Sequence, residues 1–335
     1  MKNLSASLLF VLLALAGQLA SAQTIRRVNN SGITGTNIYA TIQAAHDAAT
    51  AGDIIQVEPS TTTYAGFTCT KQLSIVGPGY FLGENQPPAL QANTIPATVS
   101  TVYFNAGSAG SSIAGISSNA TWYVGANNVV IQRCYITGYV YLSYGVLTSN
   151  AVIRQNYFYG VLEYSGASTN SLITNNIMYT GGTSLSSTGS SGEFSNNSVI
   201  AGGTSLNNFT VRNNYFATTF TPTSNTNWDY NFFAQSTLPT LGTVGTHNTA
   251  NVTAASIFAL APTAPGQFDA WYKLKSGSNA AVGAGQGGVD IGATGSATGY
   301  GYHFGGLPAI PAIYQLNQAV TGNTLNVTLG TRSNN

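Results

Sequence analysis

Charge is what this sequence has least of. Only 6% of its 335 residues are Asp, Glu, Lys or Arg, against about 25% in an ordinary soluble domain. Lys2 apart, nine basic side chains balance nine acidic ones, so the chain lacks the electrostatic footprint that nucleic acid or an anionic membrane would need. Hydrophobic residues make up 43% and aromatic residues 11%, which is enough for a core and argues against disorder. We expect no nucleic-acid partner.

Cysteine is also scarce, with Cys69 and Cys134 the whole complement. Two cysteines cannot build a disulfide framework. In the architecture inferred below they fall several coils apart, whereas a disulfide needs Cα atoms within about 7 Å of each other. We therefore expect two buried free thiols, since free cysteine is among the most buried residue types.

A long hydrophobic run is missing as well. The apolar run from Leu8 to Ala16 is shorter than the ~20 residues that cross a bilayer, so we expect no membrane span. It follows Lys2 and precedes Ala20-Ser21-Ala22, which is the pattern of a secretory signal peptide. The sequence thus predicts a signal peptide over residues 1–22, Gln23 as the first mature residue, and a secreted or cell-surface location, extracellular or periplasmic.

What the sequence does contain is an internal repeat between residues 130 and 233. Six segments share one pattern, whose fifth residue is Cys in the first segment and Asn in the other five. Successive members of this column are 22, 20, 21, 17 and 17 residues apart. The column comprises Cys134, Asn156, Asn176, Asn197, Asn214 and Asn231.

Apolar residues flank this column at fixed offsets, three before it and two after it, as the inward positions of two short strands would. An asparagine between such strands tolerates a left-handed backbone and can hydrogen-bond to the same amide in the next coil. The rows offer no apolar stripe of helical period. The sequence predicts an all-β fold, a right-handed parallel β-helix with three-strand coils and an internal Asn ladder. About nine or ten coils would follow, at ~4.8 Å each.

Both ends differ from the repeat. The segment Thr41–Thr50 places Ile42, Ala45 and Ala49 on one helical face, so it predicts a short N-terminal capping helix, and a strand follows at 54–57. We assign residues 23–60 to the N-terminal cap and first strand, 61–295 to the β-helix and 296–335 to a C-terminal tail or plug. Residues 325–329 alternate like one last strand. Of a packed tail, a plug and a secretion or attachment signal, we favour the packed tail.

Here the sequence resembles a known family. The stretch ATIQAAHDAATAGDIIQVEP…TTYAG (40–66) resembles the cap and first coil of the pectin-lyase-like right-handed parallel β-helix superfamily, and KQLSIVGPGYF (71–81) looks like its second coil. YKLKSGSNAAVGAGQGGVDIGATG (272–295) is similar to the closing strand of many secreted β-helix proteins. The overall look is that of uncharacterised secreted bacterial β-helix proteins. Because the superfamily includes lyases, hydrolases and adhesins, the resemblance implies the fold rather than one activity.

The resemblance implies two kinds of chemistry to look for: a lyase with an Arg or Lys base, or a hydrolase with paired carboxylates. Between residues 100 and 260 the acids are Glu163, Glu193 and Asp229, at three different offsets from the ladder. No carboxylate pair or multi-carboxylate site is visible, so we expect no metal and no cofactor, with Ca²⁺ entering only if the chain is a lyase. Arg212 and Asp229 share a column in successive rows.

Arg212, Asp229 and Arg154 are therefore weak catalytic candidates. One interpretation is a lyase base with its orienting acid. The other is a surface salt bridge, which contributes little, and we favour it.

Aromatic side chains offer a different kind of site. Tyr135, Tyr157 and Tyr215 share the outward column just after the ladder. Tyr139 and Tyr141 alternate along the next strand, with Glu163 following one coil later. Outward tyrosines among Asn, Ser and Thr are typical of a surface that binds neutral sugars, although aromatic stacking could also serve only to stabilise the coil surface.

Three functions remain open. The first is an exported, non-catalytic surface or matrix protein that binds an extracellular polysaccharide through a Tyr/Asn/Ser/Thr face. The alternative is a polysaccharide lyase or glycoside hydrolase of the pectin-lyase-like type, so whether the chain is an enzyme is left open. The third is an ice-binding or structural rod, placed last because Ser and Thr form no regular outward column in the repeat. We expect a monomer.

Overall fold

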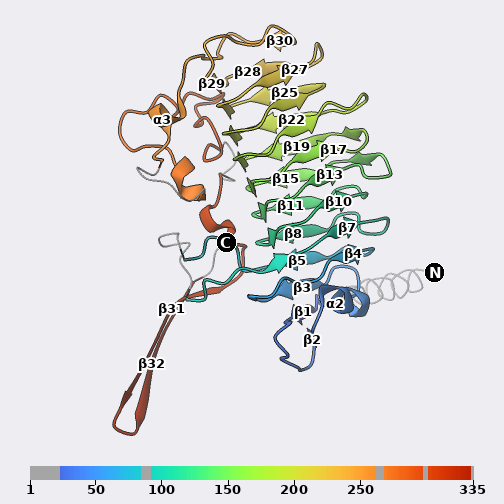
Figure 1. Ribbon diagram of the computed structural model, residues 1–335, viewed down its shortest axis with the longest axis vertical. Coiled ribbons are helices and arrows are strands. Elements are labelled where there is room, and N and C mark those ends of the chain that lie inside the picture. The colour runs from blue at the N-terminus through green and yellow to red at the C-terminus, as the bar shows by residue number, and fades with distance from the viewer. Residues whose placement is uncertain (1–22, 84–91, 261–267, 297–300, 333–335) are drawn as a thin grey trace, which may run out of the picture.

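The computed structural model describes residues 23–83, 92–260, 268–296 and 301–332. Over these residues the chain is an all-β, right-handed parallel β-solenoid of about 9 turns, which Figure 1 shows with its coils stacked along the long axis of the molecule. The predicted fold class is confirmed. The predicted signal peptide, residues 1–22, lies outside the described residues.

Three parallel sheets run the length of the solenoid. Sheet A has twelve strands, in the order β2 (Ile38–Tyr39), β1 (Ile25–Val28), β3 (Ile54–Val57), β5 (Ser74–Val76), β8 (Ser112–Ala114), β11 (Val130–Gln132), β15 (Val152–Arg154), β19 (Ser171–Thr174), β22 (Gly192–Ser195), β25 (Phe209–Arg212), β28 (Asn227–Asp229) and β30 (Thr243–Val244).

Sheets B and C have eight strands each. Sheet B contains β6 (Thr98–Val99), β9 (Ser117–Ser118), β12 (Tyr135–Ile136), β16 (Tyr157–Phe158), β20 (Ile177–Met178), β23 (Ser198–Val199), β26 (Tyr215–Phe216) and β29 (Phe232–Phe233). Sheet C contains β4 (Phe67–Cys69), β7 (Val102–Phe104), β10 (Trp122–Val124), β13 (Val140–Leu142), β17 (Leu162–Tyr164), β21 (Thr183–Leu185), β24 (Thr204–Leu206) and β27 (Phe220–Pro222). A small pair, β14 (Thr148–Ser149) and β18 (Ser168–Thr169), lies on the loops between sheets C and A.

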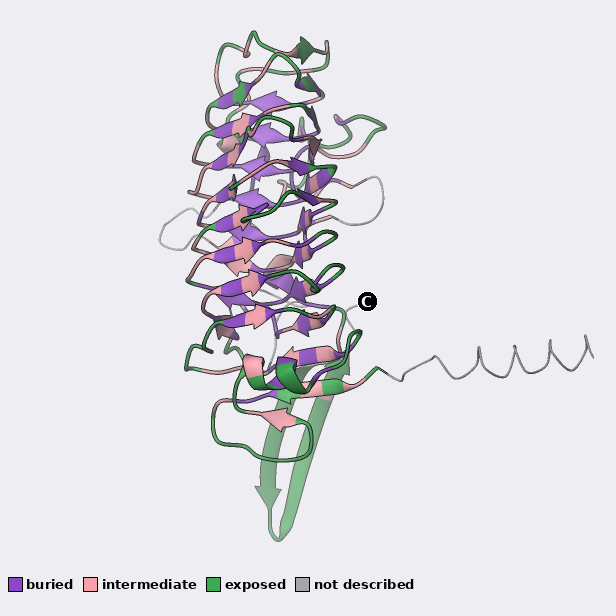
Figure 2. Cartoon of the chain, turned by 90° about the vertical axis from the view of Figure 1, so that its right-hand side faces the viewer, coloured by how far each residue is buried: buried purple, intermediate pink, exposed green. Residues whose placement is uncertain are grey.

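The core fills the inside of the coils, which Figure 2 shows as buried strand segments along the axis. Sheet A aligns its inward residues coil by coil, and all are buried: Ile131, Ile153, Ile173, Phe194, Val211 and Trp228. Sheet B does the same with Ile136, Phe158, Met178, Val199, Phe216 and Phe233. These are the two apolar columns that the repeat predicts. Cys69 and Cys134 are buried free thiols, as predicted.

The asparagine ladder lies between sheets A and B. The Asn176 amide nitrogen donates to Asn197 Oδ1 at 3.0 Å, and the same oxygen accepts from the backbone N–H of Asn176 at 3.0 Å. This pair of bonds recurs down the column from Asn156 to Asn231. It extends one coil further than predicted, to Asn248. At the other end, the backbone N–H of Cys134 donates to Asn156 Oδ1.

The left-handed residue of this turn is not the ladder asparagine, and that part of the prediction is wrong. Positive φ falls one residue earlier, where the chain turns sharply from sheet A into sheet B: Arg133, Gln155, Asn175, Asn196, Asn213 and Tyr230 have φ between 52° and 59°. The ladder residue itself points inward and is buried, so it is needed for hydrogen bonding rather than for backbone freedom. We call the preceding residues the corner column.

The corner column binds a C-terminal cover, defined as residues 254–260, 268–296 and 301–310. Arg133 donates to Leu307 O, Gln155 to Gly301 O, Asn175 to Ala293 O and Asn196 to Asp290 O, while Asn213 Oδ1 accepts from Gln286 N. The cover thus runs back along the solenoid, against the outer face of sheet B. It includes α3 (Ala254–Ile257) and the 3₁₀ turns η1 (Asp269–Tyr272) and η2 (Phe304–Gly306), and Figure 1 shows it beside the coils.

The cover corrects one expectation. Residues 272–295, which the resemblance predicts as a closing strand, contain no strand. They lie along the side of the solenoid, where Ile291 and Ala293 pack with Tyr157, Ile177 and Tyr215 of sheet B. The segment is rich in glycine and makes turns, so it follows the sheet surface instead of adding a coil.

The N-terminal cap is as predicted, with one addition. Helix α2 (Ile42–Ala48) begins at Thr41, whose hydroxyl accepts from Ala44 N at 3.1 Å, and it buries Ile42 and Ala45 over the open end of the coils. Strand β3 matches the predicted strand. The strands β1 and β2 were not predicted, and they extend sheet A beyond β3.

The end of the tail is not packed along the solenoid, contrary to the expectation that we favoured. Residues up to 310 belong to the cover, but β31 (Ala312–Thr321) and β32 (Thr324–Arg332) form an antiparallel hairpin. In Figures 1 and 2 the hairpin projects away from the coils, past the capped end. The predicted strand at 325–329 lies within β32.

Candidate functional site

The outer face of sheet C carries a single unbroken column of polar side chains. Each strand has three residues, of which the first and third point inward and are buried, while the middle one points outward. Every middle residue bears a hydroxyl or a carboxylate. In register, the column is Thr68, Tyr103, Tyr123, Tyr141, Glu163, Ser184, Ser205 and Thr221. Its members repeat at the strand spacing, about 4.8 Å.

The tyrosines of this column stack on one another. The ring centroids of Tyr103 and Tyr123 are 4.7 Å apart with planes at 6°, and those of Tyr123 and Tyr141 are 5.7 Å apart at 19°. Because neighbouring ring faces cover each other, the column offers ring edges and phenol hydroxyls to a ligand rather than open faces.

Two further tyrosines widen the column into a platform. Tyr139 stacks on Tyr141 with centroids 5.5 Å apart, and Tyr144 lies 4.4 Å from Tyr123 at 52°. They are the most exposed members, at 43% and 44%. We call these five residues the tyrosine platform: Tyr103, Tyr123, Tyr139, Tyr141 and Tyr144.

Glu163 places one negative charge at the end of the tyrosine stack. Burial is the main cause that raises the pKa of the Tyr141 phenol, and the charge of Glu163 raises it further. The phenol therefore stays protonated at neutral pH and keeps its O–H donor beside a carboxylate acceptor. Hydroxyl donors next to an acceptor, on an aromatic surface, are groups that recognise sugar hydroxyls.

Of the glycan-facing residues predicted from sequence, only Tyr139, Tyr141 and Glu163 lie on this face. Tyr157 and Tyr215 do point outward from sheet B, but the cover buries both completely, so their assignment to a glycan face is wrong. The ring of Phe258 meets Tyr215 edge-on at 5.1 Å. Tyr135 is half-buried at the margin of the same cluster.

Sequence reasoning missed Tyr103, Tyr123 and Tyr144. A signal was present, because the segments VYF (102–104), WYV (122–124) and VYL (140–142) place tyrosine at the period of the asparagine ladder. It also missed that Ser184, Ser205 and Thr221 occupy successive rungs. The inference that Ser and Thr form no regular outward column is therefore wrong for sheet C.

The weak catalytic candidates lie on sheet A. Arg212 and Asp229 are in register on neighbouring strands, as predicted, but their ion pairs are with other residues. Arg212 contacts Glu193 at 3.0 Å, and Asp229 contacts His247 at 2.9 Å. Arg154 Nε donates to Gln132 Oε1 at 2.8 Å.

A cleft of about 400 Å³ lies between sheet A and the cover, lined in part by Arg154, Glu193, Arg212 and Gln286. The Arg212 guanidinium is held there by both carboxylate oxygens of Glu193 and by Gln286 Oε1. These acceptors fix the orientation of the guanidinium within a network of side chains, so the geometry favours a structural ion pair.

Among the residues that the structure describes, no three or more His, Cys, Asp or Glu side chains gather as metal ligands would. Within the same residues, no helix has the length and apolarity to cross a membrane.

The fold and the face of sheet C together define a parallel β-helix protein with an aromatic, hydroxyl-rich surface. No family model, curated protein or solved structure matches the chain.

Proposed function

We propose that this chain is an exported β-helix protein of the pectin-lyase-like type that binds a neutral, linear polysaccharide along sheet C without cleaving it. The observation that carries the proposal is the eight-residue column of hydroxyls with Glu163 among them. Its spacing of about 4.8 Å is comparable to one sugar unit of an extended glycan, so successive sugars could meet equivalent groups.

Export is supported by the pattern of Lys2, the apolar run Leu8–Ala16 and the small residues before Gln23. A surface with one acidic group and no basic group in its column suits an uncharged ligand, because an anionic chain would meet Glu163 without a compensating cation.

The test is affinity electrophoresis of the mature protein in gels that contain neutral glucans, mannans or xylans. Tyr141→Phe removes one hydroxyl and keeps the stack, and we expect retention to weaken several-fold because one hydrogen bond is lost. Tyr230→Phe is the matched control, since Tyr230 lies on the corner column, stacked on His247. Equal retention of both variants, or none by the wild type on any neutral glycan, would overturn the proposal.

The cleft beside Arg154, Glu193 and Arg212 supports a second candidate, a polysaccharide lyase. Its assay is the ultraviolet absorbance of unsaturated uronate released from pectate, alginate or glycosaminoglycans, with calcium and with chelator. A signal that Arg212→Ala abolishes would establish the lyase and displace the non-catalytic proposal.

A further inference from the structure

The hairpin of β31 and β32 has an apolar face with no cover among the described residues. Directly opposed pairs Leu316–Leu329, Gln318–Val327 and Val320–Leu325 place five large apolar side chains on one side. These five are between 47% and 74% exposed. The opposite side carries Asn317, Ala319, Asn326 and Thr328. We call the five residues the hairpin face: Leu316, Val320, Leu325, Val327 and Leu329.

An isolated two-stranded hairpin is marginally stable in water and needs another layer on its apolar side. The rest of the chain does not supply that layer over the described residues: the hairpin projects into solvent in both views, and it is tied to the body near its root, where Ala92 N donates to Ile313 O at 2.9 Å. Its outer edges pair with no further described strand, and the charges and prolines that usually protect such edges are missing from residues 312–331.

We propose that the hairpin face is a self-association surface, on which the hairpin of a second copy of this chain packs face to face. The absence of charge favours a second copy as the partner. From residue 304 onward the sequence contains one charged residue, Arg332, and no Asp, Glu, Lys or His. An uncharged face cannot choose a foreign partner by charge, and it does not repel its own copy. A two-fold axis brings identical patches together without further design.

A membrane surface fits less well. The tip of the hairpin, Thr321 to Thr324, is polar, which disfavours insertion tip-first. A hairpin lying flat on a bilayer would have polar-face cations to hold anionic lipid, whereas this polar face has amides and hydroxyls.

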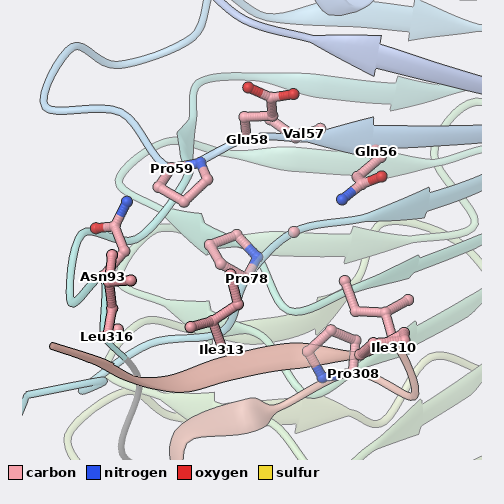
Figure 3. Close-up of a pocket in the computed structure, with 13 residues that line it drawn as sticks. Gln56, Val57, Glu58, Pro59, Pro78, Asn93, Pro308, Ile310, Ile313 and Leu316 are labelled. Atoms are coloured by element: carbon pink, nitrogen blue, oxygen red, sulfur yellow. The ribbon is translucent and has the colours of Figure 1, made fainter. Parts of the chain in front are cut away.

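The geometry of the pairing follows from the hairpin root. Leu316 also lines an apolar cavity of about 380 Å³, together with Ile313, Pro78 and Pro308, and Figure 3 shows these side chains around it. In an antiparallel pair, the tip residues Val320 and Leu325 of one copy lie toward this cavity of the other. The two-fold axis then passes near the central Gln318–Val327 pair.

The pairing is weak by itself. Two strands of nine or ten residues give a face roughly 30 Å by 10 Å, so two faces cover on the order of 600 Å², below the ~1,200 Å² of a standard interface. We expect a monomer–dimer equilibrium at micromolar concentration. This equilibrium differs from the monomer that the sequence predicts, and sedimentation decides between them.

Sedimentation of the full mature chain, over a concentration series up to on the order of 100 µM, tests the proposal. Val327→Lys places a charge on the hairpin face and should weaken dimerisation at least about 100-fold, because the axis presents the substitution twice. Thr328 follows Val327 in the chain, but its side chain lies on the opposite side of the hairpin. Thr328→Lys therefore adds the same charge away from the hairpin face and should leave the dimer intact. Unchanged thermal midpoints would show that both variants keep the folded solenoid.

A wild-type chain that stays monomeric throughout the series overturns the proposal, and so does a dimer that both variants retain, since another surface must then hold it. Binding to zwitterionic phospholipid vesicles that Val327→Lys abolishes, in a monomeric chain, would assign the face to a membrane instead. Cross-linking gives a second measurement: Val327→Cys should form a disulfide-linked dimer on mild oxidation and Thr328→Cys should not. Both native cysteines are buried, so they do not compete.

Discussion

Asn248 Oδ1 accepts two hydrogen bonds from Asn231, one from its backbone N–H at 3.0 Å and one from its side-chain amide at 3.1 Å. The same pair of hydrogen bonds joins each asparagine to the next along the ladder. From Asn176 to Asn231 every ladder oxygen therefore satisfies two donors from the coil before it, and these four side chains are fully buried. Asn248 is partly exposed, and Asn156 Oδ1 accepts from the backbone N–H of Cys134. The ladder is a continuous polar column beside the apolar core of the solenoid.

Replacing a central member should be severely destabilising. Asn197→Ala removes the acceptor of both Asn176 donors, and it removes the donor to Ile173 O and to Asn214 Oδ1. Leaving several buried groups unpaired should lower the free energy of unfolding by about 3–5 kcal/mol. The measurement is the denaturation midpoint in urea.

The matched control for that variant is Asn170→Gly. Asn170 donates to Asn150 Oδ1 on the exposed surface, at φ 54°, and glycine accepts this backbone without strain. We expect a much smaller change, and equal midpoints for the two variants would contradict the role given to the buried ladder.

Glu163 should set the charge preference of the proposed glycan face. Glu163→Gln keeps the shape and removes the negative charge next to Tyr141. We expect retention on polyuronates to rise a few-fold while retention on neutral glycans changes little, because exposed charges interact weakly. Affinity electrophoresis at low salt measures both, and high salt should abolish the difference. Gln keeps an acceptor oxygen, so a loss of neutral-glycan retention would mean that binding needs the negative charge itself.

The cover should loosen in mild acid. Burial, and secondarily the Arg133 guanidinium, lower the pKa of His303 from 6.5 to about 4. The unfolded chain then binds this proton more readily than the folded chain, so stability is full above pH 6.5 and declines as the pH falls toward 4. We expect the thermal midpoint of the wild type to drop over this range and that of His303→Gln to drop less. Parallel curves would remove His303 from the account.

Neither thiol should react while the chain is folded. Burial raises the pKa of Cys134 to about 12 and also raises that of Cys69, and the thiolate is the reactive form. A thiol reagent should label no cysteine in the native protein at pH 8 and both after denaturation in guanidinium without reductant. Labelling of neither in the denatured state would mean a disulfide that the geometry does not support.

The predicted signal peptide has a direct test in N-terminal sequencing of the protein from the medium or periplasm of an expressing bacterial cell. We expect the chain to begin at Gln23. Retention of the full N-terminus in the cytoplasm would withdraw the proposal of export.

The repeat made the solenoid predictable because it is periodic. The Ile131 and Ile136 columns, the ladder and the cap helix follow from apolar residues at fixed offsets, and Tyr103 and Tyr123 recur with a similar period toward the N-terminus. The cover was not predictable in this way. Residues 254–310 have no period, and the burial of Tyr157 and Tyr215 depends on long-range contacts with them, which local patterns do not encode.

The same limit applies to the hairpin. Alternation in residues 325–329 indicates a strand, but it does not say whether the partner strand belongs to the solenoid or to the tail itself. The charge partner of Arg212 was equally hidden. Its register neighbours are Ser195 and Asp229, yet its guanidinium pairs with Glu193, which is in register with Thr210, and side-chain direction decides this choice.

The hydrogen bonds between the corner column and the cover should change the order in which the coils of the solenoid unfold. A bare stack of coils would fray from its ends, since each coil contacts only its neighbours. Here the cover is hydrogen-bonded to the corner column at positions from Asn213 to Arg133 and spans the middle coils. None of these coils can therefore separate before the cover dissociates. The central coils should therefore unfold together as one cooperative unit rather than one coil at a time.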